Sequence, residues 1–254
     1  MLRPRIIPSL LIHKNGLVKT INFKDPKYIG DPINVVRIFN EKVVDELMVF
    51  DIDASVNQNE PNYKTIKNIA SECRMPLCYG GGIKNVEQAK KIFSLGVEKV
   101  SISSAAISNP NLIKEIVKKV GSQSMVVVLD VKKFDNNSYH IWINNGKKNT
   151  EISLIPFLKK IQDLGVGEIV INSIDNDGVM DGYDLNLIDN VYSNISIPLT
   201  ILGGAGTLDD IKNIIKKYKI IGLGVGSLFV FKGVYKAVLV NYPNHEIKNG
   251  LIKQ

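Results

Sequence analysis

Two glycine-rich stretches, Gly80-Gly81-Gly82-Ile83 and Gly203-Gly204-Ala205-Gly206, decide the fold of this chain. Each is followed, past one helix-like and one strand-like segment, by a short serine motif: Ser103-Ser104 in the first half and Gly226-Ser227 in the second. The central glycines and the serines are offset by the same 123 positions. A chain that repeats its turns at half its length is predicted to be one fold made of two similar halves.

Short apolar runs alternate with amphipathic, helix-like stretches along the whole chain. Eight of these runs are predicted to be buried strands: 6–12, 47–51, 77–79, 99–102, 125–129, 169–171, 199–202 and 220–223. Strands that alternate with helices form parallel sheets, and eight such units in 254 residues predict a closed (β/α)8 barrel. An open doubly wound sheet is the competing fold, but only two fused half-barrels explain the repeat. We therefore expect residues 1–254 to form a single α/β domain, a TIM barrel.

Two segments interrupt the alternation of strands and helices. Residues 13–30 are predicted to be a long loop after the first strand, and residues 132–150 follow the fifth strand. The second segment contains Asn144-Asn145-Gly146, which indicates a hairpin. We expect both segments on the C-terminal face, where barrel enzymes carry their chemistry. Helices are predicted to begin at N-cap residues in Asp31-Pro32, Asn85, Asn109-Pro110 and Thr207.

The chain is basic, with a net charge of +7 and a pI near 9.2. Its lysines are dispersed over helix-like stretches such as 211–217, where they form solvated faces, so we expect no nucleic-acid partner. A basic chain with glycine-rich turns suits anionic small molecules instead. No apolar run approaches the ~18 residues that span a bilayer, and the N-terminus lacks the apolar stretch of a signal peptide. We therefore expect no membrane attachment.

The chain has two cysteines, Cys73 and Cys78, in helix-like and strand-like contexts. We expect them to be core residues of a reduced, cytoplasmic protein rather than a disulfide or a metal pair. Nothing in the sequence predicts a bound metal or an organic cofactor.

The glycine turns are predicted to bind phosphate. Each follows a strand and opens a helix, so backbone N–H groups and the helix dipole face an anion, and the serines add hydroxyl donors. One such turn is usually only a tight connection, but two matched sets favour a ligand with a phosphate at each end. The predicted cradles comprise Gly82, Ser103 and Ser104 in the first half, and Gly178, Gly204, Gly226 and Ser227 in the second.

Carboxylates at strand ends are the candidate acid–base groups. Asp51 and Asp130 each end a buried strand, and barrel geometry directs such positions to the catalytic face. For Asp51, catalysis and a loop-ordering hydrogen bond are equally good interpretations, and its distance of 124 positions from Asp175 nearly fits the repeat. Asp130 is favoured as catalytic because it falls between the two phosphate sites. Asp177 either binds ligand hydroxyls or shapes a turn.

Many motifs, in order along the chain, carry a resemblance to a known family. They include Arg5-Ile6-Ile7, Asp51-Ile52-Asp53-Ala54-Ser55, Gly80-Gly81-Gly82-Ile83, Ser173-Ile174-Asp175 and Gly203-Gly204-Ala205-Gly206. The chain resembles the cyclase subunit of imidazole glycerol phosphate synthase (HisF) almost end to end. The resemblance implies a barrel that takes ammonia from a glutaminase subunit (HisH), splits a bisphosphorylated ribotide with it and closes an imidazole ring.

The resemblance also implies two catalytic aspartates, at the ends of the first and fifth strands. Asp130 matches the second, but the first falls on Leu11, and the internal repeat aligns the same two positions at an offset of 119. Leucine cannot transfer a proton, and general acid–base catalysis contributes ~10²–10⁴-fold, so we expect standard cyclisation to be badly impaired. His13 and Lys19 are ionisable neighbours, but we expect neither to share the direction of Leu11. Lys19 matches the family's lysine on a mobile, substrate-covering loop.

The ammonia path that the resemblance implies looks complete in this sequence. Arg5, Glu46, Lys99 and Glu168 match the family's ring of two bases and two acids at the ammonia entrance. Opposite charges in such a ring keep one another ionised. Glu98 and Gln123 match the face that docks the glutaminase.

Three functional hypotheses follow. The first is a paralogue that resembles those of surface-polysaccharide or flagellar glycan pathways, where a glutaminase and an ATP-using amidotransferase turn a sugar acetamido group into an acetamidino group. The second is a true cyclase subunit of histidine biosynthesis. The third is a non-catalytic scaffold that binds a phosphorylated ligand and regulates the glutaminase. Leu11 favours the first hypothesis.

Overall fold

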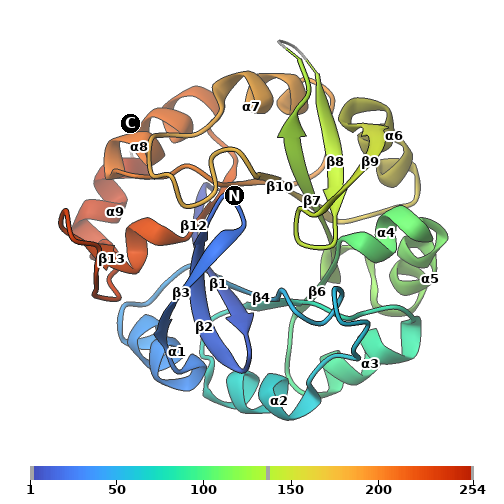
Figure 1. Ribbon diagram of the computed structural model, residues 1–254, viewed down its shortest axis with the longest axis horizontal. Coiled ribbons are helices and arrows are strands. Elements are labelled where there is room, and N and C mark those ends of the chain that lie inside the picture. Colours follow the sequence, from blue (N-terminus) through green and yellow to red (C-terminus); the bar gives the residue numbers. More distant parts are fainter. Residues whose placement is uncertain (1–2, 136–137, 253–254) are drawn as a thin grey trace.

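The computed structural model describes residues 3–135 and 138–252, and within them eight parallel strands close into a barrel surrounded by helices (Figure 1). The barrel strands are β1 (Arg5–His13), β4 (Leu47–Asp51), β5 (Leu77–Gly80), β6 (Lys99–Ile102), β7 (Met125–Lys133), β10 (Glu168–Ser173), β11 (Leu199–Leu202) and β12 (Gly222–Val225). The ring closes because β1 pairs with both β12 and β4, and β10 pairs with both β7 and β11. The predicted (β/α)8 barrel is confirmed.

Helices cover the outside of the barrel (Figure 1). They are α1 (Pro32–Glu41), α2 (Tyr63–Glu72), α3 (Val86–Ser94), α4 (Ser104–Ser108), α5 (Asn111–Val120), α6 (Leu154–Asp163), α7 (Leu185–Tyr192), α8 (Leu208–Tyr218) and α9 (His245–Ile252), with 3-10 turns η1 (Ser122–Ser124) and η2 (Ser227–Phe229). Asp31, Asn85 and Thr207 each accept a hydrogen bond from the first turn, as predicted. Asn109 does not, because Pro110 precedes the helix with helical dihedral angles and α5 begins one residue later than predicted.

Side chains alternate between the barrel interior and the helix-facing side of each strand. The interior holds an apolar layer of Ile7, Met48, Cys78, Val126, Val128, Val170 and Leu202. A larger apolar cluster contains side chains from the strands and from the helices that cover them. Cys78 is buried, Cys73 is half-buried, and both are free thiols, which agrees with the expectation that neither forms a disulfide.

The predicted loop over residues 13–30 is wrong: this segment is the hairpin β2 (Gly16–Ile21) and β3 (Lys24–Gly30), which extends β1. Each turn has only two central residues, Lys14-Asn15 and Asn22-Phe23. All four adopt positive φ, the geometry of tight hairpin turns, for which Asn-Gly or Asp-Gly is the usual signal. The hairpin escaped prediction because neither turn carries glycine at these positions.

The second predicted hairpin is confirmed, as β8 (Tyr139–Ile143) and β9 (Lys148–Ser153) after β7, with Asn144, Asn145 and Gly146 at positive φ between them. Residues 136 and 137 of that segment lie outside the described residues. The eighth barrel strand begins two residues later than predicted. Lys219 leaves α8 at positive φ and Ile220 is exposed, so neither can join the sheet. A short antiparallel pair, β13 (Phe231–Lys232) and β14 (Ala237–Val238), follows η2.

The sheet register confirms the internal repeat and corrects part of its alignment. Leu11 pairs with Phe50, and Asp130 pairs with Asn172, so Leu11 and Asp130 occupy equivalent places, as predicted. The glycine turns follow β5 and β11, which are offset by 122 positions. Gly81 therefore corresponds to Gly203 rather than to Gly204, one residue away from the predicted match.

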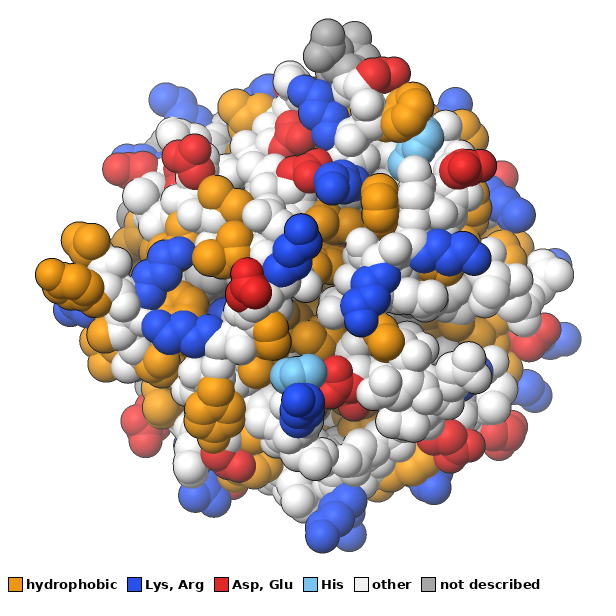
Figure 2. Space-filling model, in the orientation of Figure 1, with side chains coloured by type: hydrophobic (Ala, Val, Ile, Leu, Met, Phe, Trp, Pro, Cys, Tyr) orange, Lys and Arg blue, Asp and Glu red, His pale blue; other side chains and the backbone are white. Residues whose placement is uncertain are grey.

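The surface fits the expectation of dispersed charge. On the face shown in Figure 2, lysine and arginine side chains are scattered among the other types and do not gather into a single patch. No described helix combines the length and the apolar character needed to cross a membrane.

Candidate active site at the C-terminal end of the barrel

A cavity opens at the carboxyl ends of the barrel strands. Its lining includes Leu11, Asp130 and every residue predicted to bind substrate: Lys19, Asp51, Gly82, Ser103, Ser104, Asp177, Gly178, Gly204, Gly226 and Ser227. The fold thus brings together residues from positions 11 to 227. The lining also contains residues that the sequence analysis missed, among them Thr20, Phe23, Phe50, Asn145 and Asn172.

The floor of this cavity has a polar half and an apolar half. In the polar half, Asn172 Nδ2 donates a hydrogen bond to Asp130 Oδ1 at 3.0 Å. Burial raises the pKa of Asp130 to about 7, although this hydrogen bond opposes the shift. The equivalent pair in the apolar half is Leu11 and Phe50, so that half has no side chain able to exchange a proton at these positions. The internal repeat aligns Asn172 with Phe50. It could therefore have shown that the second half carries a polar side chain beside Asp130 where the first half carries a phenylalanine.

Lys19 reaches the cavity from β2. Its side chain is buried, and its Nζ donates a hydrogen bond to the backbone oxygen of Ser9. Burial lowers the pKa of Lys19 to about 8, and the nearby Asp177 opposes this shift. Lys19 was expected not to share the direction of Leu11, and on β2 it lies next to Val18, the register partner of Leu11, rather than opposite Leu11 itself. It nevertheless lines the same cavity. His13 instead contacts Asp53, with 2.7 Å between Nδ1 and Oδ1, outside the lining.

Asp177 holds the β2–β3 hairpin in place. Its Oδ2 accepts a hydrogen bond from Thr20 Oγ1 at 2.7 Å, and its backbone oxygen accepts one from the N–H of Asn22 at 2.8 Å. Burial raises the pKa of Asp177, against the effect of the Thr20 hydrogen bond. The next residue, Gly178, has φ +70, and a Cβ there would lie 1.9 Å from the backbone oxygen of Thr20. Asp177 therefore shapes the loop, as one of its two predicted interpretations states, and also lines the cavity.

Asp51 orders the loop that follows β4. Its Oδ1 accepts hydrogen bonds from the N–H groups of Asp53 at 3.0 Å and Ala54 at 3.1 Å, and burial raises its pKa. This geometry confirms the loop-ordering interpretation, and Asp51 also lines the cavity.

Asp175 corresponds to Asp53, not to Asp51 as the sequence suggested. The N–H of Lys14 donates to Asp53 Oδ2 at 2.8 Å, and the N–H of Lys133 donates to Asp175 Oδ2 at 2.9 Å. Each carboxylate therefore ties the end of one strand, β1 or β7, to the loop after its neighbour. The two halves of the barrel thus repeat the same contact.

The two predicted cradles have matching backbone shapes. Ser103, before α4, has φ −123 and ψ −85, and Gly226, before η2, has φ −101 and ψ −90. Both residues line the cavity, and each precedes a short helical turn, α4 or η2, whose first N–H groups have no partner within that turn. An anion beside such N–H groups would be stabilised. Gly204 is also required for packing, since a Cβ there would lie 2.1 Å from the backbone oxygen of Gly182.

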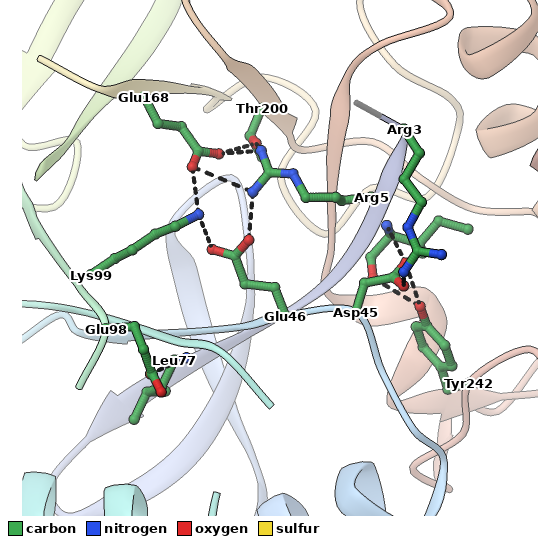
Figure 3. Close-up of polar contacts among 11 residues, drawn as sticks. Arg3, Arg5, Asp45, Glu46, Leu77, Glu98, Lys99, Glu168, Thr200 and Tyr242 are labelled. Atoms are coloured by element: carbon green, nitrogen blue, oxygen red, sulfur yellow. Dashed lines mark hydrogen bonds and ion pairs between the residues drawn. The ribbon is translucent and has the colours of Figure 1, made fainter. Parts of the chain in front are cut away.

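A closed ring of charges lies at the opposite, N-terminal end of the barrel (Figure 3). Arg5 contacts Glu46 through Nη1, and its Nη2 lies 2.7 Å from Glu168 Oε1. Lys99 Nζ lies 2.8 Å from Glu46 Oε1 and 2.8 Å from Glu168 Oε2. The four side chains predicted for the ammonia entrance thus form one alternating network. Thr200, which the sequence analysis missed, adds a 2.6 Å hydrogen bond to Glu168 Oε1.

Burial and attraction act against each other in this ring. Burial disfavours the charges of Arg5 and Lys99, but the two glutamates outweigh it and raise the pKa of both cations. Burial would likewise raise the pKa of Glu168, but Arg5 and Lys99 lower it. All three groups therefore stay ionised at neutral pH. Glu98 and Gln123 lie exposed just before β6 and β7, on the same end of the barrel.

Interior positions connect the ring to the cavity. On β1 these positions are Arg5, Ile7, Ser9 and Leu11. On β10 they are Glu168, Val170 and Asn172. The charged ring is thus followed by an apolar layer and then by the cavity floor. A small neutral molecule can enter such an apolar layer at a much lower free-energy cost than an ion, because burial of an unpaired charge is costly.

Fold and site together define a TIM barrel with a cavity lined by two similar glycine turns at one end and a charged ring at the other. The sequence profile of the family described as "Histidine biosynthesis protein" matches residues 5–236.

Two similar proteins bear provisional names as HisF subunits of imidazole glycerol phosphate synthase. One, from Leptospira borgpetersenii, is 56% identical over 99% of both chains. The other, hisF3 of Vibrio vulnificus, is 56% identical over 96% of this chain and 94% of its own. An imidazole glycerol phosphate synthase subunit HisF from Lactococcus lactis is 40% identical over 90% of this chain and 89% of its own. The chain belongs to the HisF family.

Proposed function

We propose that this chain receives ammonia from a HisH-like glutaminase at the ring of Arg5, Glu46, Lys99 and Glu168, and delivers it to the cavity at the other end of the barrel. There the ammonia serves an ATP-using amidotransferase that turns a sugar acetamido group into an acetamidino group during surface glycan synthesis. The observation that carries this proposal is Leu11, which takes the place equivalent to Asp130 in a cavity that otherwise keeps its predicted residues.

The preserved parts support ammonia delivery. A ring, an apolar layer and a cavity that holds Lys19 and both phosphate cradles form one continuous set of interior positions. A chain that had lost its role entirely would have no reason to keep four mutually dependent charges. The numbered names hisF2 and hisF3 of relatives from Pseudomonas aeruginosa and Vibrio vulnificus also fit a paralogue of the HisF subunit.

A second candidate is the authentic cyclase subunit of histidine biosynthesis. It is favoured by Asp130, whose pKa of about 7 suits a proton-transferring group at neutral pH, and by Lys19 in the same cavity. In this case Lys19 would replace the missing aspartate.

One experiment separates the two candidates. The chain, its glutaminase and the amidotransferase are combined with glutamine labelled with 15N in its amide group, ATP and an acetamido nucleotide sugar. We expect 15N in the amidino group of the product by mass spectrometry, and no 15N when this chain is left out. In parallel, free ammonia and the histidine-pathway ribotide are supplied to the chain alone. Turnover at the rate of an authentic cyclase would overturn the proposal and support the second candidate.

A further inference from the structure

A row of aromatic and basic side chains leads outward from the cavity along β7 and β8. Alternate residues of a strand point to the same side. On β7 the interior positions Val126, Val128 and Asp130 are therefore followed, beyond the barrel, by Lys132 and then by Phe134, one residue past the strand. Figure 1 shows β7 and β8 leaving the barrel towards the rim of the molecule.

Strand β8 adds two side chains to this row. Trp142 pairs with Asp130 and His140 pairs with Lys132 in the antiparallel register. Residues directly opposite each other in such a pair project to the same face. Ile141, which lies between them, points to the other face and belongs to the large apolar cluster that includes the helices. The β7–β8 strip is defined by Lys132, Phe134, His140 and Trp142.

The strip is ordered by its own contacts and open to solvent at its outer end. The rings of Phe134 and His140 stack with their centroids 4.1 Å apart and 14° between their planes. Lys132 Nζ lies 5.3 Å from the centroid of the Trp142 ring. His140 and Trp142 are half-buried, but Phe134 is 65% exposed. Packing within the described residues therefore accounts for little of the surface of Phe134.

The inner end of the strip meets the cavity. Asp130, beside Trp142, lines the cavity, and so does Asn145 in the turn that follows β8. An elongated ligand can therefore lie on the strip with one end in the cavity. Aromatic side chains stack on nucleobases, and a lysine among them attracts phosphate. The order of groups fits a base at Phe134, a diphosphate beside Lys132 and a sugar at the cavity edge.

We propose that the β7–β8 strip binds the nucleoside diphosphate portion of a nucleotide sugar and directs the sugar towards the cavity. This identification of the ligand rests on the proposed function, in which an acetamido nucleotide sugar is the acceptor. The strip would then bring the acetamido group to the end of the barrel where the amidotransferase acts. ATP shares the nucleoside diphosphate chemistry, so the experiment compares the two ligands.

The chain contains a built-in reporter, because Trp142 is its only tryptophan. Tryptophan fluorescence is excited at the red edge of its absorption, where nucleotides do not absorb, while the chain is titrated with UDP-N-acetylglucosamine. We expect saturable quenching, since a base stacked on the strip lies near Trp142. N-acetylglucosamine 1-phosphate, which has the same sugar but no base, should not quench. ATP should quench only at much higher concentrations.

Variants test the strip itself. Phe134→Ser should raise the half-saturating concentration of UDP-N-acetylglucosamine roughly fivefold or more, the lower end of what one base–aromatic stack contributes. Phe134→Tyr retains a ring and should bind like the wild type. Lys132→Gln should weaken binding most at low salt, because the lysine acts on phosphate through its charge.

Two matched controls should bind like the wild type. Tyr235→Ser removes an exposed aromatic ring from the β13–β14 turn, away from the strip. Lys133→Gln removes the exposed lysine next to Lys132, whose register partner is Tyr139 on the opposite face of β7 and β8.

The opposing outcomes are distinct. The inference is wrong if UDP-N-acetylglucosamine causes no saturable quenching, or if Phe134→Ser binds it like the wild type. Quenching by ATP alone, or equal quenching by N-acetylglucosamine 1-phosphate, would also overturn it. The proposed function fails separately: binding on the strip without 15N transfer to the sugar would remove that function and leave the site standing. Transfer of 15N at an unchanged rate by Phe134→Ser, without binding on the strip, would do the reverse.

Discussion

Leu11 is the residue at which the two halves of the barrel differ chemically. It occupies the register position of Asp130, lines the same cavity and lies beside Phe50. We expect Leu11→Asp to raise turnover of the histidine-pathway ribotide with free ammonia, because a carboxylate there restores a group that can move protons. A gain towards the ~10²–10⁴-fold typical of general acid–base catalysis would be measured by steady-state kinetics. Leu11→Asn is the control, because it is polar and of similar size but has no titratable group. An equal gain in both variants would contradict the proton-transfer explanation.

Asp130 provides a second test at the scale of one residue. Its pKa is 3.8 in an unstructured chain and about 7 in the fold, because burial disfavours the charge. The folded state therefore binds more protons than the unfolded state between these values, and the contribution of Asp130 to stability falls as pH rises from about 4 to about 7. We expect Asp130→Asn to gain stability relative to the wild type over this interval. Urea denaturation at several pH values measures it. Asp51 and Asp177, whose pKa values are also raised, remain in both proteins and cancel. Parallel stability curves for the two proteins would show that Asp130 keeps an ordinary pKa.

At the scale of elements, sequence patterns predicted the barrel strands well and the β2–β3 hairpin poorly. Strands such as β4 and β11 were predicted with their observed bounds, because a buried parallel strand is a short, nearly continuous apolar run. The hairpin strands carry polar residues such as Lys24, Asp25 and Lys27, and their two turns lack glycine at the positions of positive φ. Neither periodicity nor turn chemistry marked them. The resemblance predicted Lys19 at the substrate site, but its position on a strand that pairs with β1, and its hydrogen bond to the backbone oxygen of Ser9, could not be predicted without this hairpin.

The same hairpin depends on Gly178. A Cβ at this position would lie 1.9 Å from the backbone oxygen of Thr20, and the φ of +70 is unfavourable for alanine. We expect Gly178→Ala to separate the hairpin from the loop after β10 and to destabilise the fold by more than about 1 kcal/mol. Limited proteolysis should then cut within β2 or β3, and thermal denaturation should show the loss. Gly250→Ala is the matched control, since nothing lies within 4 Å of a Cβ there and the residue is in α9. Equal protease resistance of both variants would mean that the hairpin is held elsewhere.

At the scale of the whole molecule, the charged ring and the cavity lie at opposite ends of one interior. The ring was predictable as a set of residues from its resemblance to a family, but Thr200 was not, because a threonine in a buried strand has many other uses. Removal of one cation from the ring should lower the stability of the N-terminal end of the barrel and also reduce the supply of ammonia to the cavity. We expect Lys99→Met to leave Glu46 and Glu168 as neighbouring buried carboxylates that lack one of their two cations. Breaking a buried ion pair in this way costs about 3–5 kcal/mol.

The functional consequence of Lys99→Met should appear only when ammonia enters through the ring. With the glutaminase bound and glutamine as nitrogen source, we expect product formation to fall, while free ammonia supplied from the cavity side is used as before. Lys90→Met is the control, because Lys90 contacts Glu87 on an exposed helix surface. The ratio of the glutamine-dependent to the ammonia-dependent rate is the decisive measurement, since a general loss of stability lowers both rates together. An unchanged ratio would show that the ring has no part in ammonia transfer and only stabilises the N-terminal end of the barrel.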